Sequence, residues 1–128
     1  MKILLDTCSF LWLVTEPEKL SKKAITLIKS KEHTFFLSSI SLWEINIKAK
    51  IGKLKIEGDL NRLTNSEFFA DVFEPLDFTA QDALQITDLK LYHRDPFDLM
   101  LILQAITNDL MILTPDRHMS KYKIKTLW

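Results

Sequence analysis

Two kinds of hydrophobic pattern alternate along this chain. Short apolar or β-branched runs predict buried strands, whereas longer stretches repeat their apolar residues at the three- and four-residue spacing of helices. Strands that alternate with helices are typical of an α/β fold with a mostly parallel central sheet. The predicted strands are Lys2–Leu5, Thr34–Leu37, Val72–Leu76, Met111–Thr114 and Ile124–Trp128.

Residues at the predicted helix ends support this division. Ser21 can cap one helix, Thr79 and Asp82 form a capping-box pattern, and Asp95 precedes a proline that suits a first helical position. Pro75 lacks an amide donor, which favours an edge position for its strand. The predicted helices are Phe10–Val14, one from Ser21 through Ile28, one from Ser39 or Ser41 to about Ile51, a weaker one over Asp59–Phe69, one from Thr79 to about Leu89, and one from Pro96 to about Thr107.

Length and composition suit one compact, soluble domain over residues 1–128. Of the 128 residues, 47% are hydrophobic and 27% are charged, and no repeat or low-complexity linker interrupts them. No apolar run is long enough to cross a bilayer, and Asp6 comes too early for a secretory signal. With Cys8 as its single cysteine, the protein is predicted to be cytoplasmic and to have no disulfide.

Net charge does not indicate a nucleic-acid partner, because seventeen basic and seventeen acidic residues balance. The basic residues nevertheless gather in two stretches, one from Lys48 to Lys55 and one from Arg117 to Lys125. Solvated helix faces have the same appearance. These stretches become informative only if they flank an active site.

Two of the predicted strands lead into an aspartate. Asp6 follows the first strand, and Asp116 follows the strand that ends at Thr114. Sites in open parallel sheets form outside the carboxyl ends of the strands, so the two carboxylates meet at one edge if their strands are neighbours. Each also has a simpler explanation, because aspartate is common in turns and at helix N-termini.

Glu44 falls inside an apolar stripe of its predicted helix. At 100° per residue, Ile40, Ile47 and Ile51 lie close to it around the helix axis. A buried, ionised carboxylate needs a cation, a proton or a metal nearby. The simpler alternative is an ion pair with Lys48, one turn further on. Because the helix carries apolar residues on its far side as well, we favour a functional role.

Asp95 and Asp98 stand at the predicted start of one helix. The helix dipole favours negative charge at this end of a helix, which is a sufficient structural reason for the presence of either carboxylate. It is a weaker reason for the presence of both. The preceding His93 and Arg94 fit a loop, and a structural role is favoured for His93.

Convergence of these acids in one cleft predicts a divalent-metal site. Four or five like charges cannot all stay ionised without compensation, and hard cations with oxygen ligands provide it. Two magnesium ions about 3.5–4 Å apart can activate a water and stabilise the leaving oxygen of a phosphodiester. The sequence has no zinc-type Cys/His spacing and no phosphate-binding glycine loop, which disfavours a zinc enzyme or a P-loop nucleotidase.

Several short motifs follow one another from Met1 to Trp128: Asp6-Thr7, then Ser41-Leu42-Trp43-Glu44-Ile45 with Lys48 and Gly52-Lys53-Leu54, then His93-Arg94-Asp95-Pro96-Phe97-Asp98, then Thr114-Pro115-Asp116-Arg117, and finally Leu127-Trp128. Each motif alone is weak, but the ordered set is specific. Together they resemble the PIN-domain family, and within it the VapC-like toxins of type II toxin–antitoxin systems.

The resemblance implies a three-layer α/β/α PIN fold, RNA cleavage that depends on magnesium or manganese, and neutralisation by a cognate antitoxin. The acids of the family correspond to Asp6, Glu44, Asp98 and Asp116, which become the expected catalytic and metal-binding residues. Asp95 is a further metal-binding acid of this branch. The resemblance also marks supporting hydroxyl groups and candidate RNA-binding residues, which are Thr7 and Thr114 for the former and Lys48, Lys53, Arg94 and Arg117 for the latter.

Three positions depart from the family pattern without removing an acid. Cys8 stands where histidine or asparagine is common, Leu99 where this branch often has arginine, and Leu103 where a small residue is usual. Leu99 could therefore alter RNA contacts or substrate choice, whereas catalysis is not put in doubt.

Other functions fit the residues less well. A haloacid-dehalogenase-type phosphatase needs an aspartate where this chain has Cys8, and a receiver domain needs adjacent acids near the N-terminus. A housekeeping PIN nuclease without an antitoxin remains open, as does a PIN-like protein that only binds RNA or a partner. Retention of every acid argues against the last, because an idle acidic cluster is destabilised by self-repulsion.

The apolar content also bears on partners, which are expected to be an antitoxin and a second copy of the chain, in a homodimer or a toxin–antitoxin hetero-oligomer. Symmetric pairing is the commonest way to bury an exposed apolar surface. Five apolar residues are candidates for such a surface, although each is more simply explained as core. They are Phe10, Trp12, Leu13, Phe68 and Phe69.

Overall fold

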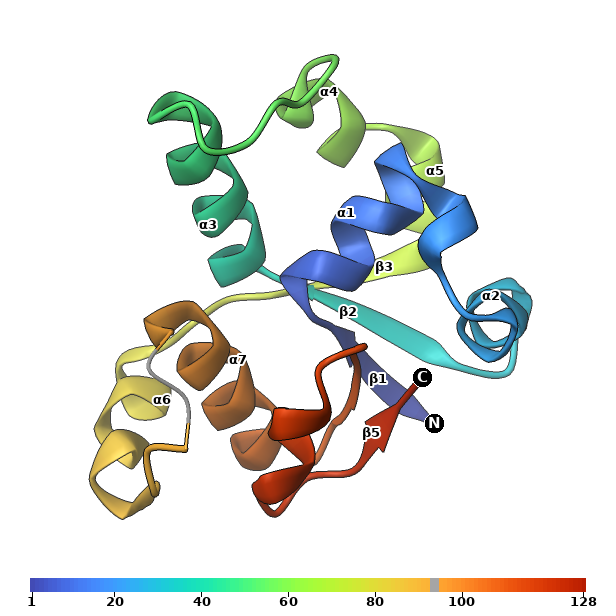
Figure 1. The fold of residues 1–128 in the computed structure, drawn as a ribbon. Helices are drawn as coiled ribbons and strands as arrows, with labels where there is room; N and C mark the ends of the chain where they lie inside the picture. The colour runs from blue at the N-terminus through green and yellow to red at the C-terminus, as the bar shows by residue number, and fades with distance from the viewer. Residues whose placement is uncertain (93–94) are drawn as a thin grey trace.

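A five-stranded sheet organises the chain, and every pair of neighbouring strands in it is parallel (Figure 1). The computed structural model describes residues 1–92 and 95–128. The strand order is β3-β2-β1-β4-β5, which confirms the parallel sheet predicted from the sequence. The strands are β1 (Lys2–Leu5), β2 (Thr34–Ser38), β3 (Phe73–Leu76), β4 (Met111–Leu113) and β5 (Thr126–Leu127).

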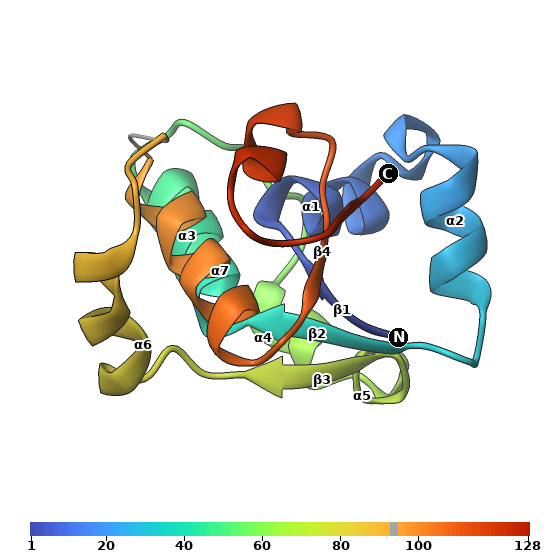
Figure 2. The same cartoon turned by 90° about the horizontal axis from the view of Figure 1, so that it is seen from below.

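Helices cover both faces of the sheet. In Figure 1, α1 and α2 lie on one side of the strands and α6 and α7 on the other, and Figure 2 shows α7 alongside α3. The α-helices are α1 (Thr7–Thr15), α2 (Lys22–Lys29), α3 (Ser39–Lys50), α4 (Leu60–Thr64), α5 (Glu67–Val72), α6 (Ala80–Leu84) and α7 (Pro96–Thr107). Three short 3₁₀ turns are η1 (Pro17–Lys19), η2 (Gln85–Asp88) and η3 (Arg117–Lys121).

Alternation along β1 divides the core into two layers. Ile3 and Leu5 join a cluster with Phe10 of α1, whereas Leu4 faces a second cluster with Leu101 and Ile102 of α7. All six side chains are fully buried. Since successive residues of a strand point to opposite faces, these clusters place helices above and below the sheet. The three-layer α/β/α architecture is thereby confirmed.

The order of the strands reverses at β1, which has β2 on one side and β4 on the other. Leu4 is in register with Phe36 of β2 and with Ile112 of β4. Such a reversal opens a crevice outside the carboxyl ends of the strands. The segments that follow Leu5 and Leu113 leave the sheet at this crevice.

Several element boundaries differ from those predicted. Helix α1 begins at Thr7, three residues before Phe10, because Asp6 caps it. The N-cap of α3 is Ser38, one residue before Ser39 and three before Ser41, the two serines at which this helix was expected to begin. The final strand is restricted to Thr126–Leu127. Pro75 does lie in the edge strand β3, as its missing amide donor predicts.

Two predicted helices are broken into shorter pieces. The stretch Asp59–Phe69 forms α4 and α5, because Ser66 caps a new helix by accepting a hydrogen bond from the Phe69 amide. The helix that starts after Thr79 has the predicted capping box, but it tightens into the 3₁₀ turn η2 after Leu84. Within the described residues, no helix has the length and apolar character that crossing a membrane requires.

Two adjacent phenylalanines of α5 have opposite environments. Phe69 is 8% exposed and its ring contacts Phe10 and Phe73, with centroids 6.3 Å and 5.2 Å away, whereas Phe68 is 55% exposed. Phe10 and Phe69 are therefore core residues, and Trp12 and Leu13 pack against the same core. Of the five candidates for a covered surface, Phe68 is the one that stands well exposed.

This difference in burial predicts that alanine substitutions at the two phenylalanines lower the free energy of unfolding by very different amounts. Phe69→Ala should lower the free energy of unfolding by about 3–5 kcal/mol, because it leaves a cavity between packed rings. Phe68→Ala should change it by no more than about 0.5 kcal/mol. Urea unfolding followed by circular dichroism measures both, and equal losses would contradict the packing of α5 described here.

Candidate active site

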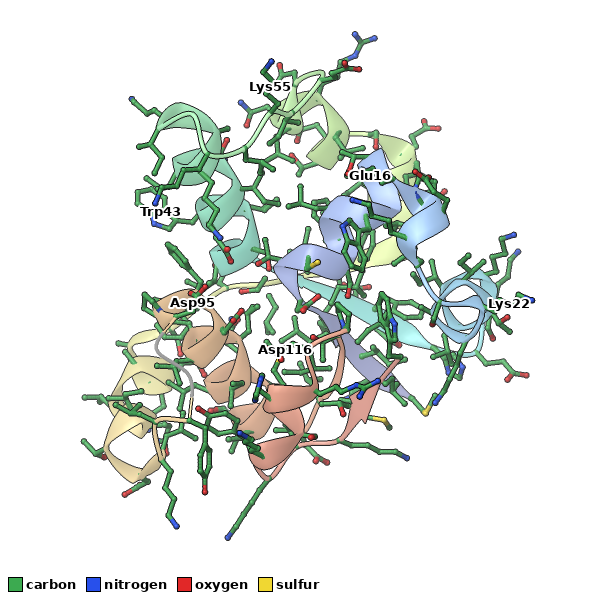
Figure 3. All side chains as sticks on the ribbon, viewed as in Figure 1. Glu16, Lys22, Trp43, Lys55, Asp95 and Asp116 are labelled. Atoms are coloured by element: carbon green, nitrogen blue, oxygen red, sulfur yellow. The ribbon has the colours of Figure 1, made fainter. Side chains whose placement is uncertain are left out.

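The carboxyl ends of β1 and β4 open into a cleft of about 510 Å³. Its walls contain all five predicted acids, together with the supporting Thr7 and the candidate RNA-binding lysines Lys48 and Lys53. Figure 3 shows Asp95 at the start of α7 and Asp116 near the middle of the view, where the chain leaves β4. The acids that line the cleft are Asp6, Glu44, Asp95, Asp98 and Asp116.

Asp6 is the most constrained of these acids. It is 4% exposed and caps α1, because its Oδ1 accepts a hydrogen bond of 2.8 Å from the Ser9 amide. Its Oδ2 accepts a second bond, of 2.6 Å, from the Thr114 hydroxyl. Burial raises the pKa of Asp6, and the charge of Asp116 adds to this shift, while the hydrogen bonds from Ser9 and Thr114 oppose it.

Thr114 connects the two aspartates that follow the central strands. Its hydroxyl donates to Asp6 and accepts a bond of 3.0 Å from the Asp116 amide. The Ser9 hydroxyl donates to the Leu113 carbonyl at 2.9 Å, which fastens the start of α1 to the end of β4. The two strand ends are therefore held together by side chains as well as by the sheet.

Glu44 of α3 is buried in the cleft wall with a partner on each oxygen. Thr7 donates to Oε1 at 2.8 Å, and Ser41 Oγ lies 3.1 Å from the same threonine hydroxyl. The Lys48 ammonium forms an ion pair with Oε2. The ion pair suggested as the simpler explanation of Glu44 is therefore present, and the same residue also lines the acidic cleft.

Lys48 is the cation that most directly balances these acids. The hydrogen bond to Glu44 raises the pKa of Lys48, and the charges of Asp95 and Asp98 contribute to the same shift. Its ammonium thus responds to carboxylates on two helices, α3 and α7.

Helix N-termini provide further compensation for the negative charge of these acids. Asp6 caps α1, Asp95 caps α7 by accepting a bond of 2.9 Å from the Phe97 amide, and Asp116 caps η3 by accepting one of 2.8 Å from the His118 amide. Asp98 lies in the first turn of α7. Backbone amides at a helix start favour negative charge, so the simpler structural reasons for these aspartates hold together with their gathering in one cleft.

The donor set suits a hard divalent cation, although the acids are not drawn tightly together. Within the described residues, no group of three or more His, Cys, Asp or Glu side chains is close enough to hold a metal ion. The carboxylates instead lie along the walls, each held by a local partner. A carboxylate has about four acceptor sites, so these bonds leave acceptor capacity on Asp6 and Glu44, and oxygen ligands are those that Mg²⁺ prefers.

Cys8 does not compete as a ligand. It lines the cleft, but burial raises the pKa of its thiol to about 11, with a further contribution from the charge of Asp6. The raised pKa favours the protonated thiol in the metal-free protein, and a soft sulfur ligand does not suit a hard cation such as Mg²⁺.

A family model described as the PIN domain matches residues 3–125. This chain belongs to the PIN domain family. Proteins of this family are nucleases that generally use a divalent metal ion. A comparison with curated protein sequences gives no match.

Solved structures with the same fold cover nearly all of this PIN domain. VapBC2 from Rickettsia felis, bound to a DNA fragment from its promoter, has 17% identity and a TM-score of 0.73, covering 100% of this chain and 99% of that chain. DNA-bound VapBC from Salmonella typhimurium has 21% identity and a TM-score of 0.69, and the match covers 99% of this chain and 97% of that chain. A toxin–antitoxin complex from Klebsiella pneumoniae has 13% identity and a TM-score of 0.64, and the match covers 98% of this chain and 96% of that chain.

The basic residues predicted to bind RNA are placed differently in the PIN domain. Lys48 and Lys53 line the cleft, whereas Arg117 is exposed at the start of η3 and is not among the lining residues. Arg94 lies outside the described residues, as does His93.

Sequence reasoning missed two serines that support the acids. The Ser9 amide donates to Asp6, and Ser41 contacts Thr7, which in turn donates to Glu44. Ser9 could have been found, because it stands three residues after an aspartate that ends a strand, where a capped helix places an amide donor. The contact between Ser41 and Thr7 joins residues 34 positions apart, so no local sequence pattern predicts it.

The burial of Asp6 predicts a pH-dependent gain of stability on removing its charge. In the metal-free protein at neutral pH, Asp6→Asn should raise the free energy of unfolding, because asparagine still caps α1 and no buried charge remains. The folded pKa of Asp6 lies above the unfolded value, so the wild-type penalty is complete above the folded pKa. It disappears as the pH falls below the unfolded value.

Urea unfolding in EDTA over a pH series measures this difference. Glu74→Gln on the exposed edge strand is the control, and it should show no comparable gain. If Asp6→Asn is less stable than the wild type at neutral pH, burial of the Asp6 charge does not destabilise the folded protein. The same conclusion follows if the difference in free energy of unfolding persists in acid.

Proposed function

We propose that this PIN domain is a metal-dependent endoribonuclease that cleaves RNA phosphodiester bonds. The observation that carries the proposal is the gathering of five carboxylates along one cleft at the carboxyl edge of the sheet. In this role Asp6, Glu44, Asp98 and Asp116 bind Mg²⁺ or Mn²⁺ and act in catalysis, and Asp95 is a further metal ligand. When bound, such an ion supplies an activated water and stabilises the charge of the leaving oxygen.

The other lining residues have positioning roles in this proposal. Thr7 orients Glu44 and Thr114 orients Asp6 through the hydrogen bonds that they donate. Lys48 and Lys53 face the cleft from α3 and the segment after it, where lysines attract phosphate groups without reading sequence. The acids alone would repel RNA, and these two lysines reduce that repulsion as the substrate approaches.

We further propose that the protein is the toxin of a type II toxin–antitoxin pair. The similar solved structures include VapBC assemblies and a toxin–antitoxin complex, and they extend over almost the entire chain. A positively charged side chain of an antitoxin, placed among these carboxylates, would form charge-assisted hydrogen bonds and compete with the metal. A housekeeping nuclease without an antitoxin is the alternative.

A homodimer is part of the same proposal. Trp43 and Ile51 of the α3 region are 60% and 59% exposed, and Figure 3 places Trp43 on the outer side of α3. Large exposed apolar side chains of this kind suit a symmetric contact between two copies.

Cleavage of labelled single-stranded RNA tests the nuclease. The protein should cleave with Mg²⁺ or Mn²⁺ and not in EDTA, and Asp98→Asn should lower the rate by at least about 100-fold with the fold retained. Asp109→Asn, just beyond the other end of α7, is the matched control, because Asp109 has a positive φ of 52° that asparagine also tolerates. Undiminished cleavage in EDTA, with contaminating nuclease excluded, would refute the metal mechanism.

Expression in a bacterial host tests the toxin. The chain alone should arrest growth. Growth should resume on co-expression with the product of the adjacent small open reading frame, and it should also resume when the chain carries the Asp98→Asn substitution. Binding between the two products is checked by co-purification. If no neighbouring product binds and expression is harmless, although the purified protein cleaves RNA, the protein is a housekeeping nuclease.

A further inference from the structure

A second cavity, of about 410 Å³, lies between the end of α7, η2 and η3. None of the described residues lines both this cavity and the acidic cleft. Its lining combines apolar side chains, such as the buried Leu103 and the half-buried Leu89, with lysines and tyrosines. Such a mixture suits a ligand that has both a flat apolar part and negative charge.

The charge at this cavity is positive, unlike that of the acidic cleft. Lys90, Lys121 and Lys123 are exposed at its walls, and Asp88 is the acid among its lining residues. Within the described part of the chain, none of these lysines forms an ion pair. The cavity therefore has an excess of positive charge in a chain whose total charge is zero.

Tyr92 presents an aromatic ring at the same cavity. It is 49% exposed, while its neighbour Tyr122 is 6% exposed. The two rings meet nearly perpendicularly, with centroids 5.2 Å apart, and the Tyr92 amide donates to the Tyr122 hydroxyl at 2.9 Å. Tyr122 thus holds the Tyr92 ring in place while much of that ring stays accessible.

The chain connects this cavity closely to the acidic cleft. Tyr92 stands three residues before Asp95, and Lys121 stands two residues after Met119, which lines the cleft. Extended chain covers at most about 3.6 Å per residue, so these pairs are separated by no more than about 11 Å and about 7 Å between Cα atoms. A single-stranded nucleic acid of the usual footprint, about 4–16 nucleotides, extends further than this.

We propose that the second cavity binds the flank of the single-stranded RNA whose scissile bond lies in the acidic cleft, with a base stacked on Tyr92 and phosphates at Lys121 and Lys123. This inference rests on the nuclease function proposed above. Aromatic rings beside lysines bind single strands through stacking and phosphate contacts with little dependence on sequence. The site would therefore increase affinity for longer RNA without taking part in the reaction.

Binding of a labelled RNA of about 12 nucleotides, followed by fluorescence anisotropy in EDTA, tests the site without cleavage. Tyr92→Ala should weaken binding about five-fold or more, whereas Tyr92→Phe keeps the ring and should bind as the wild type does. The double variant Lys121→Ala/Lys123→Ala should lower the salt dependence, as the slope of log K against log salt, by roughly 0.7 for each lysine.

Two exposed lysines of α2, changed as Lys22→Ala/Lys23→Ala, are the matched control and should leave binding and salt dependence unchanged. With metal present, Tyr92→Ala and the double lysine variant should raise KM for the long RNA and leave kcat unchanged. That split separates an RNA-binding role from a general loss of structure.

The outcomes distinguish the two proposals. If the wild-type protein cleaves RNA and the variants bind and cleave as it does, the second site is wrong and the nuclease stands. If RNA binds through Tyr92 and the lysines but no metal supports cleavage, the site stands and the nuclease is wrong. If the substitutions spare RNA binding and weaken the antitoxin complex instead, the surface is a protein interface and the RNA assignment is overturned.

Discussion

Negative charge gathered at the carboxyl edge of a parallel sheet is the constraint on which the rest of this PIN domain depends. Asp6 and Asp116 follow adjacent strands, so the sheet itself brings them to one crevice. Burial already disfavours the charge of Asp6, and Asp116 adds repulsion. The surrounding structure offsets this with donors placed at each acid.

Those donors explain why the elements begin where they do. Helices α1 and α7 and the turn η3 all start at an aspartate of the cleft, which directs backbone amides at negative charge. Thr7 and Thr114 add hydroxyl donors, and Lys48 adds a full positive charge beside Glu44. These donors offset part of the repulsion among the acids, and a divalent cation bound in the cleft would relieve more of it.

The sequence alone was sufficient for the parts of this arrangement that depend on local pattern. Buried β-prone runs predict that Asp6 and Asp116 each follow a strand, and Asp95 caps α7 as its proline neighbour predicts. The sequence left open whether those two strands are neighbours, and the pairing of β1 with β4 shows that they are. Contacts between distant segments were not accessible in this way. Thr7 meets Glu44 across 37 positions, and Tyr92 meets Tyr122 across 30. The break between α4 and α5 depends on the Ser66 cap, a local signal that the helical pattern of the surrounding residues obscured.

We propose that Glu44 binds the divalent cation of the cleft and does not serve only as the ion-pair partner of Lys48, and calorimetric titration of Mn²⁺ tests this role most directly. Glu44→Gln should weaken Mn²⁺ binding by at least about ten-fold. Lys48→Ala should leave the affinity unchanged or increase it, because a competing cation is removed. If the affinity of Glu44→Gln equals that of the wild type, or if Lys48→Ala reproduces the loss, Glu44 is a structural partner of Lys48 and not a ligand.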